Sequence, residues 1–545
     1  MPDILARLPS IIAAWIGPNI KLWLETRQPQ LWALALVAGL TVSVGAIIFR
    51  ELIGMVQWVW LRDTSENVAS AAAQLPWYVI VGAPAAGGLL VGLGLRTLLP
   101  ARRTFAVADV IESRAYSGRT LKLREALYSA GLTALSLGSG ASAGREGPVV
   151  HLGAAIASAT GRYFSLPDWA KRTLLASGVA AAISASFNAP IAGVLFAHEV
   201  ILGHYAMRAF VPIVLASVSG TILSRLWFGD VAAFSIPAYQ ITSFWEFPAF
   251  ALLGIVCALV SVLFQFALIS ADYVARNIRI TVVLRPVIGG LMVGLIALEF
   301  PHVLGVGYEA TDAALRNQLS LSLMLWLLVV KTAATAITLA SRFGGGIFSP
   351  SLYLGAMAGG SFGLIAAQVF PEMASSQGLY AILGMGAVAA AVLGAPISTT
   401  VMVFELTGGY ALSIALLLCV SIANGLNHAI HGHSFFQWQL EMRGIFLTEG
   451  PSRHVPRTRR VRDFMTEASE EDAERTHVPE SDGPALKPND TLEAALRAFD
   501  SSGHERLAVI DPDQPERIAG WASQVHALRF FNRALVAASE EEHHH

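Results

Sequence analysis

Two Gly-rich stretches carry the residues best suited to chemistry: GSGASAGREGPVVHLG at 138–153 and GGGIFSP at 344–350. Pro is favoured in the first turn of a helix, because the N–H group that it lacks has no acceptor there. Pro148 and Pro350 therefore each predict a helix start. A helix N-terminus combines free N–H groups with about half a positive charge, which makes it an anion site. Because glycines let the backbone turn tightly and approach a ligand closely, we predict that the two stretches together bind one small anion.

Glu146 stands inside the first stretch, directly after Arg145. A carboxylate beside an anion site competes with the anion for the same N–H groups, so deprotonated Glu146 would block the site as a tethered anion. A protonated or displaced Glu146 would open the path. The alternative is a structural ion pair between Arg145 and Glu146, which is disfavoured because neighbouring residues on a helix do not face each other. A carboxylate inside a membrane also costs on the order of 3 kcal/mol on insertion scales, which favours a functional role. We predict that Glu146 is a gate.

These stretches need apolar elements to hold them, and the composition supplies such elements. The chain has 545 residues, of which 54% are hydrophobic and 14% charged, against about 25% charged in an average soluble domain. Apolar runs recur from about residue 31 to about residue 432, and several approach the roughly 20 residues that span a bilayer. The sequence therefore predicts an all-α, multi-pass integral membrane protein. The net charge of -2 gives no case for nucleic-acid binding, and the position of Cys257 and Cys419 in apolar runs favours core residues over metal ligands.

The membrane part of the sequence repeats itself. Besides the prolines of the two Gly-rich stretches, Pro190 matches Pro396, and a glutamate follows nine residues after each of them, at Glu199 and Glu405. A weak two-fold repeat with Gly- and Pro-interrupted apolar runs is typical of transporters and channels. In such folds the broken helices of the two halves meet at the binding site.

Composition divides the chain into a membrane part and a soluble part. The basic stretch RHVPRTRRVR (453–462) follows the last apolar run, and positive residues beside a span favour the cytoplasmic side. Binding of anionic lipid or nucleic acid by this stretch is the alternative. The expected parts are an amphipathic cytoplasmic segment at 1–30, a membrane domain at 31–447 with halves at roughly 31–235 and 245–447, a cytoplasmic linker with a small domain at 448–540, and a remnant of an expression tag at 541–545.

Four stretches, GSGASAGREGP, FNAPIAGVLF, GGGIFSPS and GAPISTTVMVFELTGGY, resemble the signature stretches of the CLC family of chloride channels and chloride/proton antiporters. The resemblance covers roughly residues 31–447. It implies an inverted repeat with broken helices and a homodimer in a lipid bilayer, with a pore for chloride or similar small anions in each subunit. It also implies transport and no enzymatic activity, no cofactor, and both termini in the cytoplasm at a bacterial inner or plasma membrane.

Carried over residue by residue, the resemblance makes Glu146 the gating glutamate. It assigns an outer anion to the backbone amides of Arg145, Glu146 and Gly147, and a central anion to those of Ile347 and Phe348.

The sequence departs from the family pattern at three positions. Where family members carry a hydroxyl in their first anion motif and a tyrosine at the inner gate, this chain has Phe105 and Phe436, and phenylalanine donates no hydrogen bond. We expect a central site made of backbone amides alone, which holds chloride more weakly by about 1 kcal/mol per lost donor. The third position is Val200, which replaces the glutamate that delivers protons in antiporters of the family.

Val200 carries no proton and favours passive conduction, although its neighbours His198 and Glu199 leave a substitute proton path for antiport open. Fluoride transport is a further alternative, but the retained Pro148 favours chloride. The stretch HEVILGH (198–204) raises an intramembrane metalloprotease as a remote alternative. Its histidines are six residues apart instead of four and would not share a helix face, so we expect no metal site.

The soluble part contains VRDFM (461–465) and a longer stretch at 485–523 that resemble a CBS module, so we expect a small cytoplasmic α/β domain. One copy is whole and a second is reduced to VRDFM and an acidic linker. His526 stands where nucleotide-binding copies often carry an aspartate, which argues against nucleotide as a ligand and leaves a dimer-stabilising role.

Overall fold

The computed structural model divides the chain into two compact units. One comprises Met1–Val110, Leu121–Gly203 and Ala209–Phe436, and the other comprises Ile111–Thr120, His204–Arg208 and Gln437–His545. The residues that the structure describes are 16–21, 23–115, 120–230, 234, 239, 241–372, 374–407, 412–446, 456, 459–469, 483–511 and 517–543. Most of the expected N-terminal segment and of the acidic linker, half of the basic stretch, and the last two residues lie outside this description.

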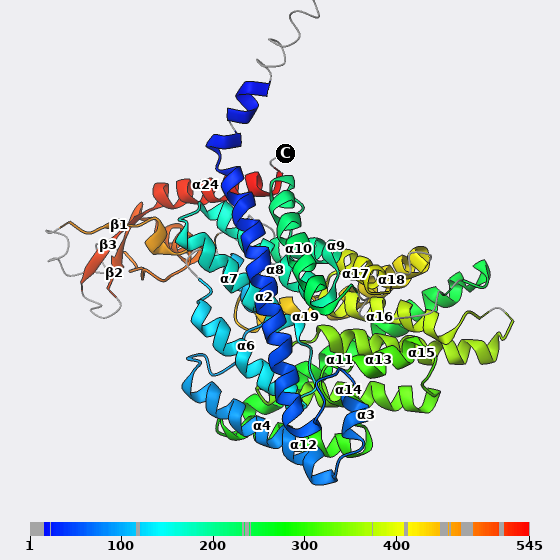
Figure 1. Cartoon of the computed structure of the whole chain (residues 1–545). Helices are drawn as coiled ribbons and strands as arrows, with labels where there is room; N and C mark the ends of the chain where they lie inside the picture. Colours follow the sequence, from blue (N-terminus) through cyan, green and yellow to red (C-terminus); the bar gives the residue numbers. More distant parts are fainter. Residues whose placement is uncertain are drawn as a thin grey trace, which may run out of the picture. The chain divides into compact units, whose positions relative to one another are not determined.

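The larger unit is helical, as the apolar runs predict (Figure 1). The helices of the first half are α2 (Gln28–Leu61), α3 (Val68–Ala72), α4 (Trp77–Thr97), α5 (Val107–Ala115), α6 (Leu123–Gly138), α7 (Glu146–Tyr163), α8 (Asp168–Phe187), α9 (Pro190–Phe196), the π-helical turn η1 (Ala197–Leu202) and α10 (Met207–Phe228). Those of the second half are η2 (Phe244–Glu246), α11 (Phe247–Asn277), α12 (Leu284–Glu299), η3 (Pro301–Val303), α13 (Tyr308–Leu315), α14 (Leu321–Ala340), α15 (Phe348–Val369), α16 (Gln377–Leu393), α17 (Pro396–Thr407), α18 (Ser413–His431) and α19 (Phe435–Glu441).

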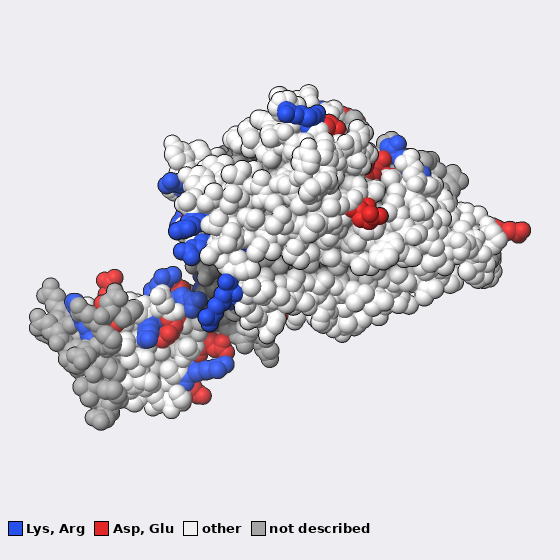
Figure 2. All heavy atoms as spheres, turned by 90° about the horizontal axis from the view of Figure 1, so that it is seen from below, with Lys and Arg blue, Asp and Glu red and all other residues white. Residues whose placement is uncertain are grey.

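Several of these helices are long and apolar enough to cross a bilayer. Among the described residues, seven helical stretches meet this criterion: Gln28–Leu61, Trp77–Thr97, Met207–Phe228, Phe244–Asn277, Leu321–Ala340, Phe348–Val369 and Ser413–Glu441. Figure 2 shows a broad surface of this unit on which uncharged side chains dominate and charged side chains are sparse, most of them toward its edges. The chain is a multi-pass integral membrane protein, because such a surface is suited to hydrocarbon and not to water.

Small residues bring α7 against α8, and the second half repeats this contact between α15 and α16. A Cβ atom added at Gly153 would lie 2.6 Å from the carbonyl oxygen of Gly178, and one at Gly178 would lie 2.4 Å from that of Gly153. Gly355 and Gly384 approach each other in the same reciprocal way, at 2.3 and 2.4 Å. Small residues allow helix backbones to pack this closely in a membrane. The paired contacts fix the directions of α7 and α15, whose starts form the candidate site.

The smaller unit is α/β, in agreement with the predicted fold class. Its described residues include three strands, which form an antiparallel sheet in the order β1-β3-β2. The elements are η5 (Val461–Asp463), β1 (Thr466–Glu467), α23 (Leu492–Ser502), β2 (Arg506–Ile510), β3 (Ile518–Ser523) and α24 (Gln524–His543). Val461 and Phe464 of VRDFM share one buried cluster with Phe499 and Leu507. The two stretches of the predicted module therefore fold as one domain, and its assignment as a CBS module stays a prediction.

Candidate anion-binding site

The two Gly-rich stretches lie against each other, although about 200 residues separate them in the sequence. The Gly144 N–H donates to the Gly346 carbonyl and the Gly346 N–H donates to the Gly144 carbonyl, both at 2.7 Å. Arg145 is the N-cap of α7 and Ile347 is the N-cap of α15. The helix starts predicted from Pro148 and Pro350 therefore exist, and the fold brings them together.

Gly144 and Gly346 at this junction leave little room for a side chain, because other parts of the chain approach both of them closely. A Cβ atom at Gly144 would lie 2.6 Å from Oε2 of Glu146 and 3.1 Å from the backbone nitrogen of Ser349. A Cβ atom at Gly346 would lie 3.2 Å from the nitrogen of Gly147. The first N–H groups of α7 and α15 have no acceptor within their own helices. The junction thus offers two sets of backbone donors to one small volume.

Glu146, the first residue of α7, places its carboxylate at this junction. The residue is 1% exposed. Its Oε1 accepts hydrogen bonds from the Tyr308 hydroxyl at 3.0 Å and the Ser349 hydroxyl at 2.5 Å. Its Oε2 is buried without a hydrogen-bond partner among the described residues. Neutral donors from α13 and α15 therefore hold a carboxylate where two helix starts converge.

Arg145 turns away from Glu146 and pairs with a different carboxylate. Its Nη1 lies 2.8 Å from Oε1 of Glu66, in the loop between α2 and α3. Nη2 of Arg50 on α2 lies 3.0 Å from the same oxygen. The guanidinium of Arg145 also lies over the Tyr308 ring, 4.9 Å from its centroid. The Arg145–Glu146 ion pair that competed with the gate is thus not formed.

Aromatic side chains pack around the start of α15. The Phe348 ring lies 5.1 Å from that of Phe187 and 5.9 Å from that of Phe196, between ring centroids. Ile347 and Phe348 are both buried. The backbone amides that the resemblance assigns to a central anion therefore stand in an apolar surrounding, where an electrostatic contact is stronger than in water.

Phe105, which stands where the family has its first anion motif, packs in a stack of three side chains. Its ring lies 5.0 Å from that of His151 with an interplanar angle of 20°, and the guanidinium carbon of Arg103 lies 5.1 Å from the ring centroid. Its N–H donates to the Ser129 hydroxyl at 2.8 Å, and the next amide donates to Asp109 at 2.9 Å. These two amides are therefore engaged within the protein, and the sequence did not single out His151.

Phe436, at the predicted place of the inner gate, is the second residue of α19 and is 5% exposed. It keeps an aromatic ring but has no hydroxyl. Neither Phe105 nor Phe436 therefore supplies the hydroxyl donor that family members have at these two positions.

The glutamates at the matching positions of the two halves cap each other's helices. Glu199 accepts from the N–H groups of Ile397 at 3.1 Å and Ser398 at 2.7 Å, and from the Ser398 hydroxyl. Glu405 accepts from the N–H groups of Ile191 at 3.0 Å and Ala192 at 2.7 Å. Negative charge at a helix N-terminus is stabilising. The sequence repeat predicted the positions but not this reciprocal capping.

Val200 lies half-buried in the π-helical turn η1. Its neighbour His198 is buried, with its ring 6.3 Å from that of Phe210. Gly203, at φ 73°, ends the helical run before His204. The two histidines of HEVILGH therefore do not share one helix face, as the spacing predicts.

Several residues at the site escaped the sequence analysis. Ser349 is part of GGGIFSP, so its hydroxyl could have been noted there. Tyr308, Glu66 and Arg50 carried no signal, because each lies outside the Gly-rich stretches and reaches the site only through the packing of α2 and α13.

Comparisons with known proteins agree with this architecture. Residues 87–428 match the profile of a family described as voltage gated chloride channel. A ClcB-like chloride channel protein from Ralstonia nicotianae is 33% identical over 394 residues, which cover 71% of this chain and 92% of the relative. The voltage-gated ClC-type chloride channel ClcB of Escherichia coli O157:H7 is 27% identical over 408 residues, covering 74% and 97%.

Solved structures share the fold. A slow cyanobacterial Cl-/H+ antiporter superposes with a TM-score of 0.69 at 24% identity, over 76% of this chain and 98% of that one. A CLC-type fluoride/proton antiporter superposes with a TM-score of 0.63 at 22% identity, over 75% and 98%. The family profile spans more than half of the chain, and its residues include both Gly-rich helix starts and the carboxylate between them. This chain is a member of the voltage gated chloride channel family, the CLC family.

Proposed function

We propose that the protein conducts chloride passively across the membrane and that Glu146 gates the pore. The observation that carries this proposal is the position of the Glu146 carboxylate between the starts of α7 and α15, where it accepts from the hydroxyls of Tyr308 and Ser349. A chloride ion would compete for the same place, since a helix N-terminus binds small anions. The donors are neutral, so the bound ion is stabilised without a full opposite charge and can leave quickly.

The proton side of the site supports conduction without antiport. Val200 has no titratable group, and Glu199 beside it is used to cap α17. If Glu199 moved in order to carry a proton, the N–H groups of Ile397 and Ser398 and the Ser398 hydroxyl would lose their acceptor. An uncompensated buried donor costs about 1–3 kcal/mol, which makes Glu199 a poor shuttle.

Phe105 and Phe436 support weak binding of the anion. Because neither phenylalanine carries a hydroxyl, a central anion would rely on the amides of Ile347 and Phe348. An outer anion would rely on the amides of Arg145, Glu146 and Gly147. We propose correspondingly fast conduction with modest discrimination among chloride and similar small anions. The retained Pro148 favours chloride over fluoride.

We further propose a homodimer with one pore in each subunit and both termini in the cytoplasm. The resemblance to the family and the basic stretch after the last apolar run support this orientation. The α2–α3 loop would then face the outside, because α2 starts on the side of the N-terminus and crosses the membrane once. The smaller unit would lie in the cytoplasm and stabilise the dimer without bound nucleotide.

Chloride/proton antiport is the second candidate. It is favoured by the fold shared with a Cl-/H+ antiporter and a fluoride/proton antiporter, and by a buried His198 next to Val200. In this case protons would reach Glu146 by a path that bypasses Val200.

A reversal-potential measurement distinguishes the two. The purified full chain in a planar bilayer, with equal chloride and a pH gradient, should pass current that reverses at zero if chloride alone moves. A reversal potential that shifts with the pH gradient would demonstrate proton coupling and reject the passive channel. Absence of any anion current would reject both candidates.

A further inference from the structure

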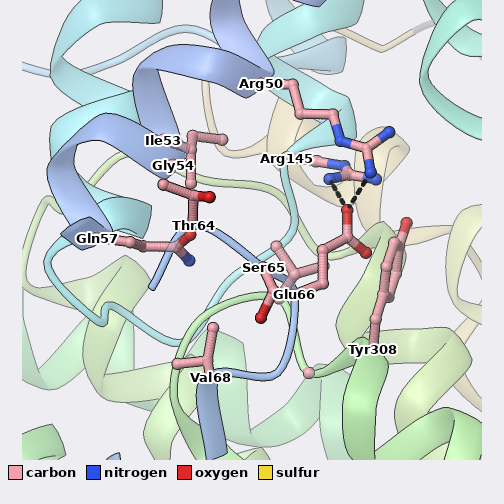
Figure 3. A pocket seen from close by; sticks show the side chains of 12 residues that line it. Arg50, Ile53, Gly54, Gln57, Thr64, Ser65, Glu66, Val68, Arg145 and Tyr308 are labelled. Atoms are coloured by element: carbon pink, nitrogen blue, oxygen red, sulfur yellow. Dashed lines mark hydrogen bonds and ion pairs between the residues drawn. The ribbon is translucent and has the colours of Figure 1, made fainter. Parts of the chain in front are cut away.

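A cavity of about 120 Å³ lies beside the gate and is lined by two arginines, a glutamate and several hydroxyl and amide side chains. Figure 3 shows Arg50 and Arg145 pointing at one oxygen of Glu66, with Tyr308 next to the carboxylate. The volume exceeds the roughly 30 Å³ that one water molecule takes in the liquid. The cavity therefore has room for an ion as well as water. We call it the arginine pocket, defined by Arg50, Glu66, Arg145 and Tyr308.

We propose that the arginine pocket is an anion-recruiting site in series with the gate, in which Glu66 occupies the place that an arriving chloride takes. The inference rests on the proposed function, since the recruited ion is the ion that Glu146 admits. Glu66 would act as a second tethered carboxylate, held by guanidinium groups where Glu146 is held by hydroxyl groups.

The charges of the pocket favour an anion. Two guanidinium groups point at one carboxylate oxygen of the pocket lining, so the formal balance of the lining residues Arg50, Arg145 and Glu66 is +1. Outside the lining, Glu51 and Glu146 also act electrostatically on Arg50 and Arg145, respectively. Both ion pairs end on Oε1 of Glu66. One oxygen thus satisfies two cations, and a monovalent anion could replace it in the same place. Chloride would gain contact with both guanidinium groups when the carboxylate swings out.

The charged side chains of the pocket become less exposed to solvent toward Glu146. The side chains of Arg50 and Glu66 are each 39% exposed, whereas that of Arg145 is 9% exposed. Arg145 lies over the Tyr308 ring, and the Tyr308 hydroxyl donates to Glu146. An ion at Arg50 and Arg145 is therefore one step away from the place that Glu146 fills.

The walls of the pocket are fixed by buried polar contacts. Glu309, next to Tyr308, accepts from the N–H groups of Ala69 and Ser70 and so ties α13 to α3. Lys331 is fully buried and donates to the carbonyls of Val303 at 3.0 Å and Gly305 at 3.1 Å, in the segment before α13. Fixed walls favour binding, because a flexible site loses part of its affinity to the entropy cost of ordering its side chains when the ligand binds.

Gly307 sets the direction in which Tyr308 leaves this segment. It has φ 91°, in the left-handed region that favours glycine. A Cβ atom there would lie 2.7 Å from the ring of Tyr353. The backbone before α13 is therefore built to present Tyr308 between the arginine pocket and Glu146.

Two opposite charge changes test the proposal. Glu66→Gln removes the competitor and raises the balance of the pocket by one charge, whereas Arg50→Gln lowers it by one. With chloride varied only on the face of the α2–α3 loop, the half-saturating concentration should fall in Glu66→Gln and rise in Arg50→Gln, each on the order of threefold. Chloride varied on the other face should give wild-type values. Right-side-out and inverted membrane vesicles supply the two defined orientations.

A matched control separates the pocket from long-range charge. Arg62→Gln makes the same charge change as Arg50→Gln near the same end of α2 but outside the pocket lining, so it should leave both half-saturation values unchanged. A shift of equal size in the control, shifts on both faces, or shifts of the same sign in Glu66→Gln and Arg50→Gln would overturn the proposal.

Equilibrium binding keeps this test separate from the proposed function. Titration calorimetry of the detergent-solubilised full chain with chloride should show tighter binding in Glu66→Gln and weaker binding in Arg50→Gln than in wild type. Unchanged affinity in both variants would reject the recruiting site even if the wild type conducts. Altered affinity without any chloride flux would reject the proposed function and leave the anion site standing.

Discussion

Glu146 and Glu66 are two carboxylates close to one path, and they are held by different chemistry. Glu146 accepts from the hydroxyls of Tyr308 and Ser349 in a buried junction of helix starts. Glu66 accepts from the guanidinium groups of Arg50 and Arg145 in a partly exposed pocket. Neutral donors leave the charge of Glu146 only partly compensated, so a proton or an anion can displace it. Opposite charges keep Glu66 ionised, which suits a site that selects by charge.

The largest change should come from Glu146→Gln, which removes the carboxylate of the proposed gate from the comparison. The pH dependence of chloride flux should largely disappear while conduction stays, because the amide cannot be deprotonated to a tethered anion. Flux measured in proteoliposomes across a pH series reports this directly. A variant that retains the wild-type pH dependence would contradict the gate.

Tyr308→Phe sharpens the comparison by removing one neutral donor from Glu146. A hydrogen bond to a charged group contributes about 1.5–3 kcal/mol, so the carboxylate should leave the site more readily. We expect chloride flux at a fixed pH to rise by up to about tenfold, since 1.4 kcal/mol corresponds to a factor of ten in an equilibrium constant.

Tyr353→Phe is the matched control for that change. The Tyr353 hydroxyl is buried and has no hydrogen-bond partner among the described residues, so its loss should leave the chloride flux unchanged. Equal changes in the two variants would mean that the effect comes from packing and not from the bond to Glu146.

Glu199→Gln and Glu405→Gln extend the comparison to two carboxylates that cap helix starts. Each variant weakens a charged cap on a helix of the opposite half, and each should lower the free energy of unfolding by about 1–2 kcal/mol. The two losses should be alike, because the contacts are reciprocal. Thermal unfolding in detergent measures them. If Glu199→Gln alone also changed the reversal potential in a pH gradient, Glu199 would be a proton carrier.

The smallest effect concerns the pH dependence of the Glu66 ion pairs. Burial disfavours the charged form of Glu66, but the positive charges of Arg145 and Arg50 outweigh it, so the pKa of Glu66 lies below its ordinary value of 4.5. A depressed folded-state pKa gives stability that is present above the unfolded pKa and is lost as the pH falls through the folded pKa. The difference in Tm between wild type and Glu66→Gln should therefore be constant at neutral pH and change only below about pH 4.5. A change near pH 7 would show that the arginines do not hold the carboxylate in this way.

The sequence predicted much of the fold because its signals are local. A long apolar run specifies a membrane helix wherever it occurs, and Pro148 and Pro350 mark helix starts through the chemistry of a single residue. The equal spacing of Pro190 to Glu199 and of Pro396 to Glu405 revealed the repeat.

The residues that surround Glu146 could not be predicted from local sequence signals. The type of residue at 146 and its place at a helix start follow from the sequence alone, because a Gly-rich turn followed by Glu-Gly-Pro favours one local conformation. The partners of that carboxylate depend on how close α7, α13 and α15 come to one another. The close contacts of Gly144 with Gly346 and of Gly307 with Tyr353 belong to the packing that sets these distances. Only the tertiary structure therefore decided that Tyr308 and Ser349 hold Glu146, while Arg145 turns to Glu66.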